Sequence, residues 1–353
     1  MCRVPGPTLA DIARAAEVST ATVSHALNGT GRVGEATRRR VRETATRLGY
    51  GTPGPPRSRT LGIAVTTFAT AWNYAEVAYF SRALTAATSA AHARGYALTT
   101  LPADRAADDS WHSLAVDGML IMDSPRGDPM VHALRARGIP LVFDGVPGDP
   151  RPGDHWVDND HEATTREVLD HLAASGARRV ALQSGNGDEH YARAVTAAYE
   201  RWCAERGAPA LVVPFDVSDD PGHGFDALLR GRDRTDAVYA AYDPGGRQLL
   251  AAAARAGLRV PDELRVVCAS EDPGYTSTEP PVSTVTLDPE RTARAAVGLL
   301  VDLVEGGAVA PGAGRAPVVV PARLIVRASS KPASSKPRHA RVPGPPGAGH
   351  AGL

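Results

Sequence analysis

From residue 61 to about residue 270, short apolar segments alternate with longer segments that have helical periodicity. The apolar segments have the length of strands, and most of the helical segments end at glycine, a residue that readily closes a helix. Strands joined through helices pair in parallel. The pattern predicts an α/β fold with doubly wound parallel sheets. The predicted strands are LGIAVT, YALTTL, VDGMLIM, IPLVFD, RRVALQS, ALVVPF, DAVYAA and LRVVCAS.

The alternation forms two series, which divide near residue 157, and we interpret them as two lobes. The predicted helices span residues 75–94, 128–137, 160–175, 191–206, 221–230 and 245–256, followed by extended PPVSTVTLD, a helix over 289–305 and extended VVVPARLIVR. We expect a core over 61–330, with one lobe from 61–156 and 273–305 and the other from 157–272 and 306–330. Two such lobes bind a small ligand at the carboxyl ends of their strands.

Residues 8–50 follow a different pattern, with helical periodicity and no strand. Thr8 precedes Asp11 by three residues, which is typical of a helix start. Ser19 is positioned to cap a second helix whose inward face holds Val23, Ala26 and Leu27, and a third helix runs over residues 35–48. Three short helices with a tight first turn predict a helix-turn-helix head.

The charge is distributed unevenly although the chain has a net charge of zero. Residues 1–59 hold 10 Arg and four acidic residues, a net charge of +6. Residues 331–353 carry +4, so the core carries −10. A basic head on an acidic body indicates a polyanionic partner. An arginine-rich surface without a ligand is the alternative, since the chain has 37 Arg and only 2 Lys.

Composition narrows the class of protein. Apolar residues at 43% and charged residues at 22% are globular values, so we expect order over most of the chain. The exceptions are a Pro-rich linker at 51–60 and a disordered basic tail at 331–353. Cys2, Cys203 and Cys268 are too far apart for a disulfide framework. We therefore expect a soluble, cytoplasmic protein with no membrane segment.

The head also carries specific motifs. T-L-x-D-I-A opens it, followed by V-S-x-x-T-V-S, L-N-G, R-V-x-x-x-T-R-x-x-V and a closing L-G-Y. With these motifs the chain resembles the LacI/GalR family of transcriptional regulators. VDGMLIM, GIPLVFDG, HLAASGARRVAL, AGLRVPDELRVV, PPVSTV and PARLIVRAS match the family's core in order. The resemblance implies a two-lobed core with periplasmic-binding-protein architecture, a small-molecule effector, a homodimer and a roughly palindromic DNA operator.

The resemblance places the DNA contacts on the second helix of the head. The residues expected to face bases are Thr20, Ala21, Ser24 and His25; those expected near phosphates are Ser19, Thr22, Asn28, Arg32 and Thr37. His25 stands where family members often have arginine, so a bidentate contact with guanine is not implied. A helix-turn-helix used for protein contact is the alternative. The family's hinge helix inserts a leucine between bases, but residues 51–60 contain no leucine. We predict that this wedge is absent.

The resemblance also suggests effector contacts in the cleft, where family members bind sugars or nucleobases. Asp243 and Asp144 match acidic positions of the family, whereas Val195 stands at its arginine position, with Arg193 nearby. The predicted effector residues are Phe68, Trp72, Asp144, Tyr191, Arg193, Asp243 and Glu271, with Tyr74 as a further aromatic candidate. Packing between the lobes is the alternative for the aromatic residues. A helix cap or a solvated loop is the alternative for the acidic ones.

No motif indicates catalysis. The segment 154–161 contains Asp154, His155, Asp158, Asp160 and His161, but we expect Asp160 to cap the next helix and no metal to bind. Neither a nucleophile elbow nor a dinucleotide fingerprint is complete, and no cofactor is expected. We predict a DNA-binding transcriptional regulator, a repressor controlled by a small ligand, and not an enzyme. The alternative is a two-lobed solute-binding protein or enzyme whose head reads no sequence.

Overall fold

The computed structural model describes residues 8–28, 31, 33–48, 58–66, 76–101, 114–185, 187–216, 223–306 and 318–331. The chain divides into two compact units, Met1–Ser58 and Arg59–Leu353. The predicted linker and basic tail fall almost entirely outside the described residues.

The head contains α1 (Leu9–Ala15), α2 (Thr20–Asn28) and α3 (Glu35–Arg47). Thr8 caps α1: its hydroxyl accepts from the Asp11 amide, and the Asp11 carboxylate accepts from the Thr8 amide. The three helices enclose a small apolar core that includes Ile12, Val23 and Val41. The prediction of three helices with a capped first turn is confirmed.

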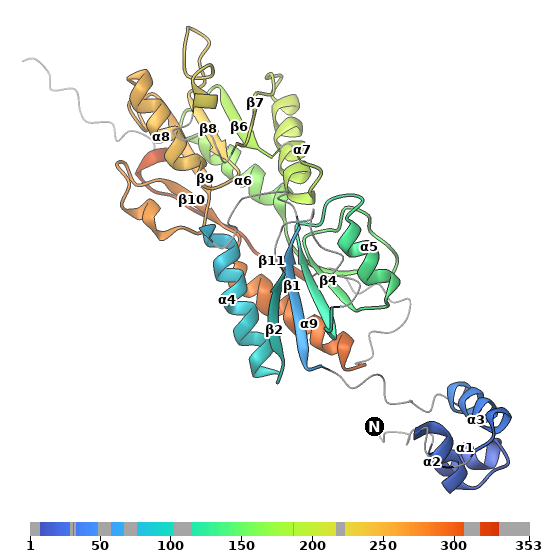
Figure 1. Cartoon of the computed structure of the whole chain (residues 1–353). Helices are drawn as coiled ribbons and strands as arrows, with labels where there is room; N and C mark the ends of the chain where they lie inside the picture. Colours follow the sequence, from blue (N-terminus) through green and yellow to red (C-terminus); the bar gives the residue numbers. More distant parts are fainter. Residues whose placement is uncertain are drawn as a thin grey trace, which may run out of the picture. The chain divides into compact units, whose positions relative to one another are not determined.

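The first lobe is built on a six-stranded parallel sheet with strand order β11-β5-β4-β3-β1-β2. Helices α4 and α9 lie on one side of this sheet and α5 on the other (Figure 1). Alternate residues of β1 face opposite sides, so Leu61, Ile63 and Val65 pack against α4 and α9, while Ala64 packs on the side of α5. The elements are β1 (Thr60–Val65), α4 (Ala78–Ala93), β2 (Ala97–Leu101), β3 (Gly118–Met122), α5 (Pro129–Ala136), β4 (Leu141–Asp144), β5 (His155–Asn159), α9 (Pro289–Val304) and β11 (Val318–Val320).

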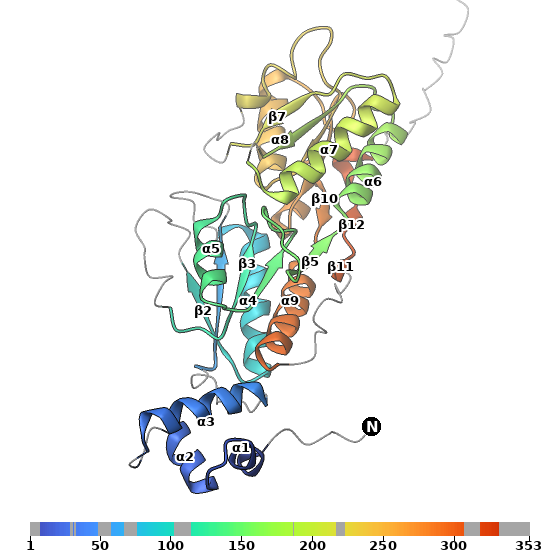
Figure 2. The same ribbon diagram turned by 90° about the vertical axis from the view of Figure 1, so that its right-hand side faces the viewer.

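The second lobe has a six-stranded sheet of order β12-β10-β9-β8-β6-β7, in which only β12 pairs antiparallel. Helices α6 and α7 cover one face and α8 covers the other (Figure 2). The elements are α6 (His161–Ala174), β6 (Val180–Ser184), α7 (His190–Glu205), β7 (Val212–Pro214), β8 (Ala237–Ala240), α8 (Gly245–Ala256), β9 (Arg265–Ala269), β10 (Ser283–Thr286) and β12 (Arg323–Ile325).

Two details of the predicted α/β pattern match the structure closely. Asp160 caps α6 through the Ala163 amide at 2.9 Å, as expected from its position before the helix. Gly257 ends α8 in the left-handed region with φ +68°, a conformation that costs glycine little.

The predicted helix over residues 221–230 is wrong. Its described part holds only a short 3₁₀ turn at His223–Phe225, followed by further turns. Pro221, Gly222 and Gly224 explain this, because proline and glycine both disfavour a helix interior. Apolar Phe225 and Leu229 are buried, which produced the helical spacing without a helix.

The predicted division of the lobes also needs correction. Strand β5 belongs to the first sheet, so that lobe continues to Asn159 rather than residue 156. Strand β10, assigned to the first lobe, pairs with β9 in the second, and β11, assigned to the second, pairs with β5 in the first. The chain therefore crosses between lobes three times, after β5, after β10 and after β11. Periodicity identifies a strand but not its pairing partner.

Candidate functional site

The second helix of the head presents short side chains on an exposed face. Ser19 caps this helix, because its hydroxyl accepts from the Thr22 amide at 3.0 Å and lies 2.8 Å from the Thr22 hydroxyl. Thr20, Ala21 and His25 are exposed; Thr22, Ser24 and, on α3, Thr37 are half-buried. These residues, which are expected to face DNA, thus lie at the surface. The opposite face of α2 is buried in the head.

Gly31, which follows α2, lies close against the imidazole of His25. Gly31 has φ +72°, and a Cβ at this position would overlap the His25 ring. Arg38 of α3 donates to the Gly31 carbonyl at 3.3 Å, which holds Gly31 against α3. Asn28 ends α2, while its side chain and Arg32 lie outside the described residues.

A cleft lies between the two lobes at the carboxyl ends of both sheets. Its lining combines tyrosine side chains with five carboxylates, and no lysine or arginine belongs to the lining among the described residues. The acidic residues are Asp123, Asp144, Asp158, Asp243 and Glu271, and the aromatic and imidazole residues are Tyr79, Phe80, His161, His190, Tyr191 and Tyr242.

Asp144 and Asp123 form the acidic side of the first lobe. Asp144 ends β4 and accepts a hydrogen bond from the Tyr79 hydroxyl at 2.8 Å. Burial, opposed by this hydrogen bond and assisted by the Asp158 charge, raises the pKa of Asp144 to about 7. Asp123 follows β3 with φ +52°, and burial next to Asp144 raises its pKa well above the usual range. Both groups are poised to gain from a ligand that donates hydrogen bonds or brings positive charge.

Asp243 is fixed within the second lobe. It accepts from the Ser270 hydroxyl at 2.9 Å and from the Tyr275 hydroxyl at 2.7 Å. Burial raises the pKa of Asp243, while these two bonds act in the opposite direction. The carboxylate is therefore held in one orientation at the edge of the cleft.

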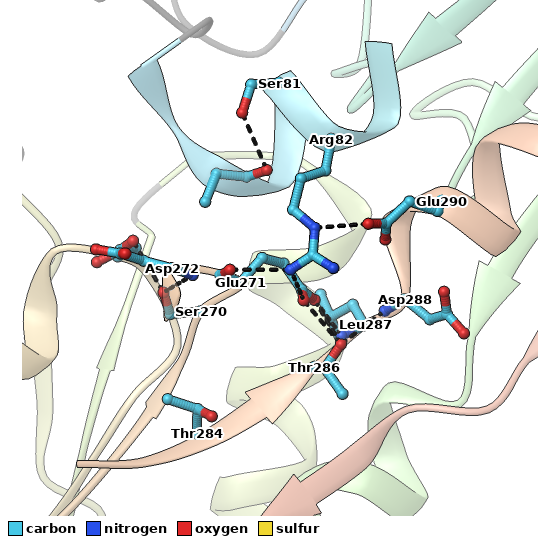
Figure 3. Close-up of polar contacts among 12 residues, drawn as sticks. Ser81, Arg82, Ser270, Glu271, Asp272, Thr284, Thr286, Leu287, Asp288 and Glu290 are labelled. Carbon is cyan, nitrogen blue, oxygen red and sulfur yellow. Dashed lines mark hydrogen bonds and ion pairs between the residues drawn. The ribbon is translucent and has the colours of Figure 1, made fainter. Parts of the chain in front are cut away.

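Glu271 connects the two lobes (Figure 3). Its side chain is 4% exposed and accepts from the Thr286 hydroxyl and the Leu287 amide of the second lobe. Arg82 of α4 reaches across from the first lobe to the Glu271 carbonyl at 3.0 Å and its carboxylate at 3.4 Å, and also pairs with Glu290 at 2.6 Å. We call Arg82 and Glu271 the interlobe latch.

The last of the five acidic residues lies beside two histidines at the first crossing between the lobes. Asp158 of β5 accepts from His161 Nε2 at 2.9 Å and from His190 Nε2 at 3.1 Å. Of the dense segment 154–161, only Asp158 and His161 join this cluster, because Asp154 pairs with Arg135 and Asp160 caps α6. Burial alone would raise the pKa of Asp158, but the two imidazole hydrogen bonds hold it well below its usual value.

Only some of the predicted effector residues line the cleft. Asp144, Tyr191, Asp243 and Glu271 line the cleft, whereas Phe68 and Trp72, with Tyr74, lie outside the described residues. Arg193 does not line it, so this prediction is corrected: the side chain is 39% exposed, near Asp188. Tyr191 and buried Val195 share the inward face of α7, and a residue two positions from Tyr191 points elsewhere.

Several cleft residues were not predicted from the sequence. Asp123 carries a usable signal, since it directly follows a predicted strand. His190 begins α7 beside the predicted Tyr191. Tyr79 and Tyr242 carry no local signal that separates them from core aromatic residues.

Comparisons with known proteins agree with this geometry. Residues 8–52 match the family model described as bacterial regulatory proteins, lacI family, and residues 169–330 match a periplasmic binding protein-like domain. The transcriptional regulator CelR of Thermobifida fusca is 29% identical over 92% of this chain and 98% of its own length. The transcriptional repressor PurR of Aliivibrio fischeri is 26% identical over 84% and 92% of the two chains.

Solved structures give the same result. A CelR–cellobiose complex superposes with a TM-score of 0.68 at 26% identity, covering 92% of this chain and 99% of that one. A lac repressor dimer bound to operator has a TM-score of 0.64 at 22% identity, covering 93% and 100% of the two chains, and supports the fold alone.

A helix-turn-helix head joined to a two-lobed binding core defines a DNA-binding transcriptional regulator with an effector-binding domain. The chain combines a DNA-binding head of the lacI family of bacterial regulatory proteins with a periplasmic-binding-protein-like domain. Its named relatives are transcriptional regulators. No helix in the described part of the chain has both the length and the apolar character needed to cross a membrane.

Proposed function

We propose that the chain acts as a homodimeric repressor and that α2 of each copy reads one half of a two-fold symmetric operator. The observation that carries this proposal is the exposed face of α2, which lies in an N-terminal region, residues 1–59, of net charge +6. A helix of this kind fits the major groove, where its first residues reach base edges. We assign base contacts to Thr20, Ala21, Ser24 and His25, and phosphate contacts to Ser19, Thr22, Asn28, Arg32 and Thr37.

The effector is a small molecule rich in hydrogen-bond donors, such as a saccharide. Support comes from the five carboxylates in the cleft and from the lack of lysine or arginine among its described lining residues. Tyr191 offers a ring face, since its hydroxyl is already bonded to the Ala241 carbonyl at 2.7 Å. Asp144, Asp243 and Glu271 would accept from ligand hydroxyl groups. The solved CelR complex contains cellobiose, which is consistent with this class.

Ligand binding would change operator affinity through a population shift. An effector that contacts both lobes favours one lobe arrangement, and its differential affinity sets the size of the response. The PurR relatives are named repressors, which supports repression here. We further propose that the protein is not an enzyme, since the cleft lacks a recognisable nucleophile and base pair among its described residues, and that it works in the cytoplasm, where the chromosome lies.

Deletion of residues 1–58 tests the proposal. The truncated core should lose at least about 1000-fold in operator affinity, a scale typical of specific over non-specific binding. Fluorescence anisotropy with labelled duplex measures the affinity, and circular dichroism confirms that the core remains folded. A core that binds operator as tightly as the full chain would refute the assignment. The alternative interpretation, a two-lobed solute-binding protein or enzyme, would then be favoured.

A further inference from the structure

The cluster of Asp158, His161 and His190 joins three elements of both lobes. Asp158 lies on β5 of the first lobe, while His161 begins α6 and His190 begins α7 in the second. One candidate ligand atom from each residue lies within 4.8 Å of the other two. The chain therefore brings two imidazole nitrogens and one carboxylate oxygen to a single point in the cleft.

The spacing of these atoms suits a transition-metal ion. Bonds of about 2.0–2.2 Å in a tetrahedral site separate neighbouring ligand atoms by about 3.3 Å. The two imidazole nitrogens lie 2.9 and 3.1 Å from the carboxylate oxygens of Asp158, so small side-chain displacements would admit an ion. Imidazole ligands favour Zn²⁺ and related ions over Mg²⁺ and Ca²⁺, which prefer oxygen.

The surroundings favour a cation. Asp123 and Asp144 line the same cleft, and no described lining residue is lysine or arginine. The side chains of Asp158 and His161 are 12% and 8% exposed, whereas His190 is 28% exposed and leaves a route to the cluster. The Tyr191 ring packs edge-on against His161, with centroids 4.9 Å apart, and limits movement of that imidazole.

We propose that Asp158, His161 and His190 bind one divalent transition-metal ion in the interlobe cleft. Three protein ligands leave a fourth position open toward the cleft, as in metal sites that accept water or a ligand oxygen. The ion ties β5 to α6 and α7, so its binding favours the lobe arrangement in which these elements meet. A consequence for operator affinity rests on the proposed function.

The competing interpretation is a hydrogen-bonded triad that binds no metal, with Asp158 neutralising two imidazoles. Equilibrium dialysis of the full chain against Zn²⁺ separates the two. The protein must lack a histidine tag and be treated with chelator first. Bound zinc is then counted by mass spectrometry. We expect one tight equivalent per chain, and visible absorption bands of a four-coordinate ion when Co²⁺ replaces Zn²⁺.

Substitutions locate the site. His190→Ala should weaken zinc binding by about 100-fold or more, beyond the 10–100-fold effect of losing a group that only supports a ligand. His132→Ala, at an exposed position of α5, is the matched control and should keep the tight equivalent. Asp158→Asn provides a second test if a histidine variant fails to fold. No saturable equivalent, or the same affinity in His190→Ala as in wild type, would overturn the metal site in favour of the triad or of adventitious surface binding.

Operator binding with and without Zn²⁺ is measured separately. A metal effect of about 5–150-fold that disappears in His190→Ala would support coupling between cleft and head. Tight zinc binding in a chain that binds no operator under any condition would support the metal site and contradict the proposed function instead. The two proposals can therefore fail independently.

Discussion

The head and the cleft differ both in charge and in construction. The head is basic, and its expected DNA contacts come mostly from one exposed helix and the residue before it. The cleft is acidic, and its carboxylates lie at or just beyond the carboxyl ends of strands that are far apart in the sequence. Exposed charges are screened by salt, whereas buried groups depend on desolvation and on individual partners. The head therefore suits a large polyanion, and the cleft a small ligand held by particular contacts.

Base-specific effects on α2 are the largest that we expect from single substitutions. Ser24→Ala and His25→Ala should each cost about 1–3 kcal/mol at discrete operator positions and little at others. Arg32→Ala should weaken all duplexes alike and reduce the slope of affinity against salt by about 1. Anisotropy titrations on a set of single-base operator variants measure both. A uniform loss in His25→Ala would remove this residue from base recognition.

The half-buried acids of the cleft should oppose folding at high pH. Asp144 has a pKa of about 7 in the folded chain and lies near Tyr79, Asp123 and Asp158. Its folded pKa is raised, so the folded state binds the proton more tightly, and stability falls as pH rises from about 4 to about 7. Asp144→Asn removes this penalty, and its side-chain oxygen can still accept from Tyr79.

The Asn variant should therefore exceed wild type in stability by about 1–2 kcal/mol at pH 8, with a smaller difference at pH 5. Chemical denaturation at the two pH values measures the free energies of unfolding. A variant that is less stable than wild type at pH 8 would show that the charged carboxylate makes a contact worth more than its burial costs.

The interlobe latch provides a smaller effect. Arg82→Met keeps the aliphatic stem but removes both contacts to Glu271 together with the ion pair to Glu290, so we expect a loss of about 0.5–1 kcal/mol in urea unfolding. Arg82 is 45% exposed, which limits the effect by solvent screening. Glu290→Gln is the control, because it alters a pair within the first lobe and should cost less than about 0.5 kcal/mol. If Arg82→Met and Glu290→Gln lowered the free energy of unfolding equally, the contacts of Arg82 with Glu271 would contribute no measurable stability.

The linker gives the smallest expected effect. Residues 51–60 contain no leucine to insert between bases, so the operator needs no easily kinked central step. Exchanging the central base pairs should change affinity by less than about 3-fold, as measured by competition titration. A larger dependence on this step would show that another part of the chain deforms the DNA.

Sequence pattern predicted the head almost completely, because caps and helix faces depend on residues within a few positions of each other. Thr8 with Asp11 and Ser19 with Thr22 illustrate this. The described strands of the core were also predicted, apart from β5, which lies in the polar segment 155–159. The lobe to which each strand belongs was not predicted correctly, because tertiary packing decides which strands pair with β10 and β11.

The cleft was predicted in part for the same reason. Asp144 ends β4 and Asp243 comes shortly after β8, and the resemblance to the family indicated both. Arg193 was predicted to face the cleft, but it lies on another face of α7, near Asp188. Tyr79 lines the cleft and contacts Asp144, which is 65 residues away in the sequence, so no local pattern indicates it. The pairing of Asp158 with His190 likewise joins two lobes, and no local pattern indicates it.

Selection of random duplex DNA on the purified full chain, at about 150 mM salt, tests the central claim most directly. The account predicts a two-fold symmetric motif whose half-sites change in a His25→Ala variant. Weak, salt-sensitive binding without any motif, from a folded dimer and in the presence or absence of Zn²⁺, would contradict sequence reading by α2.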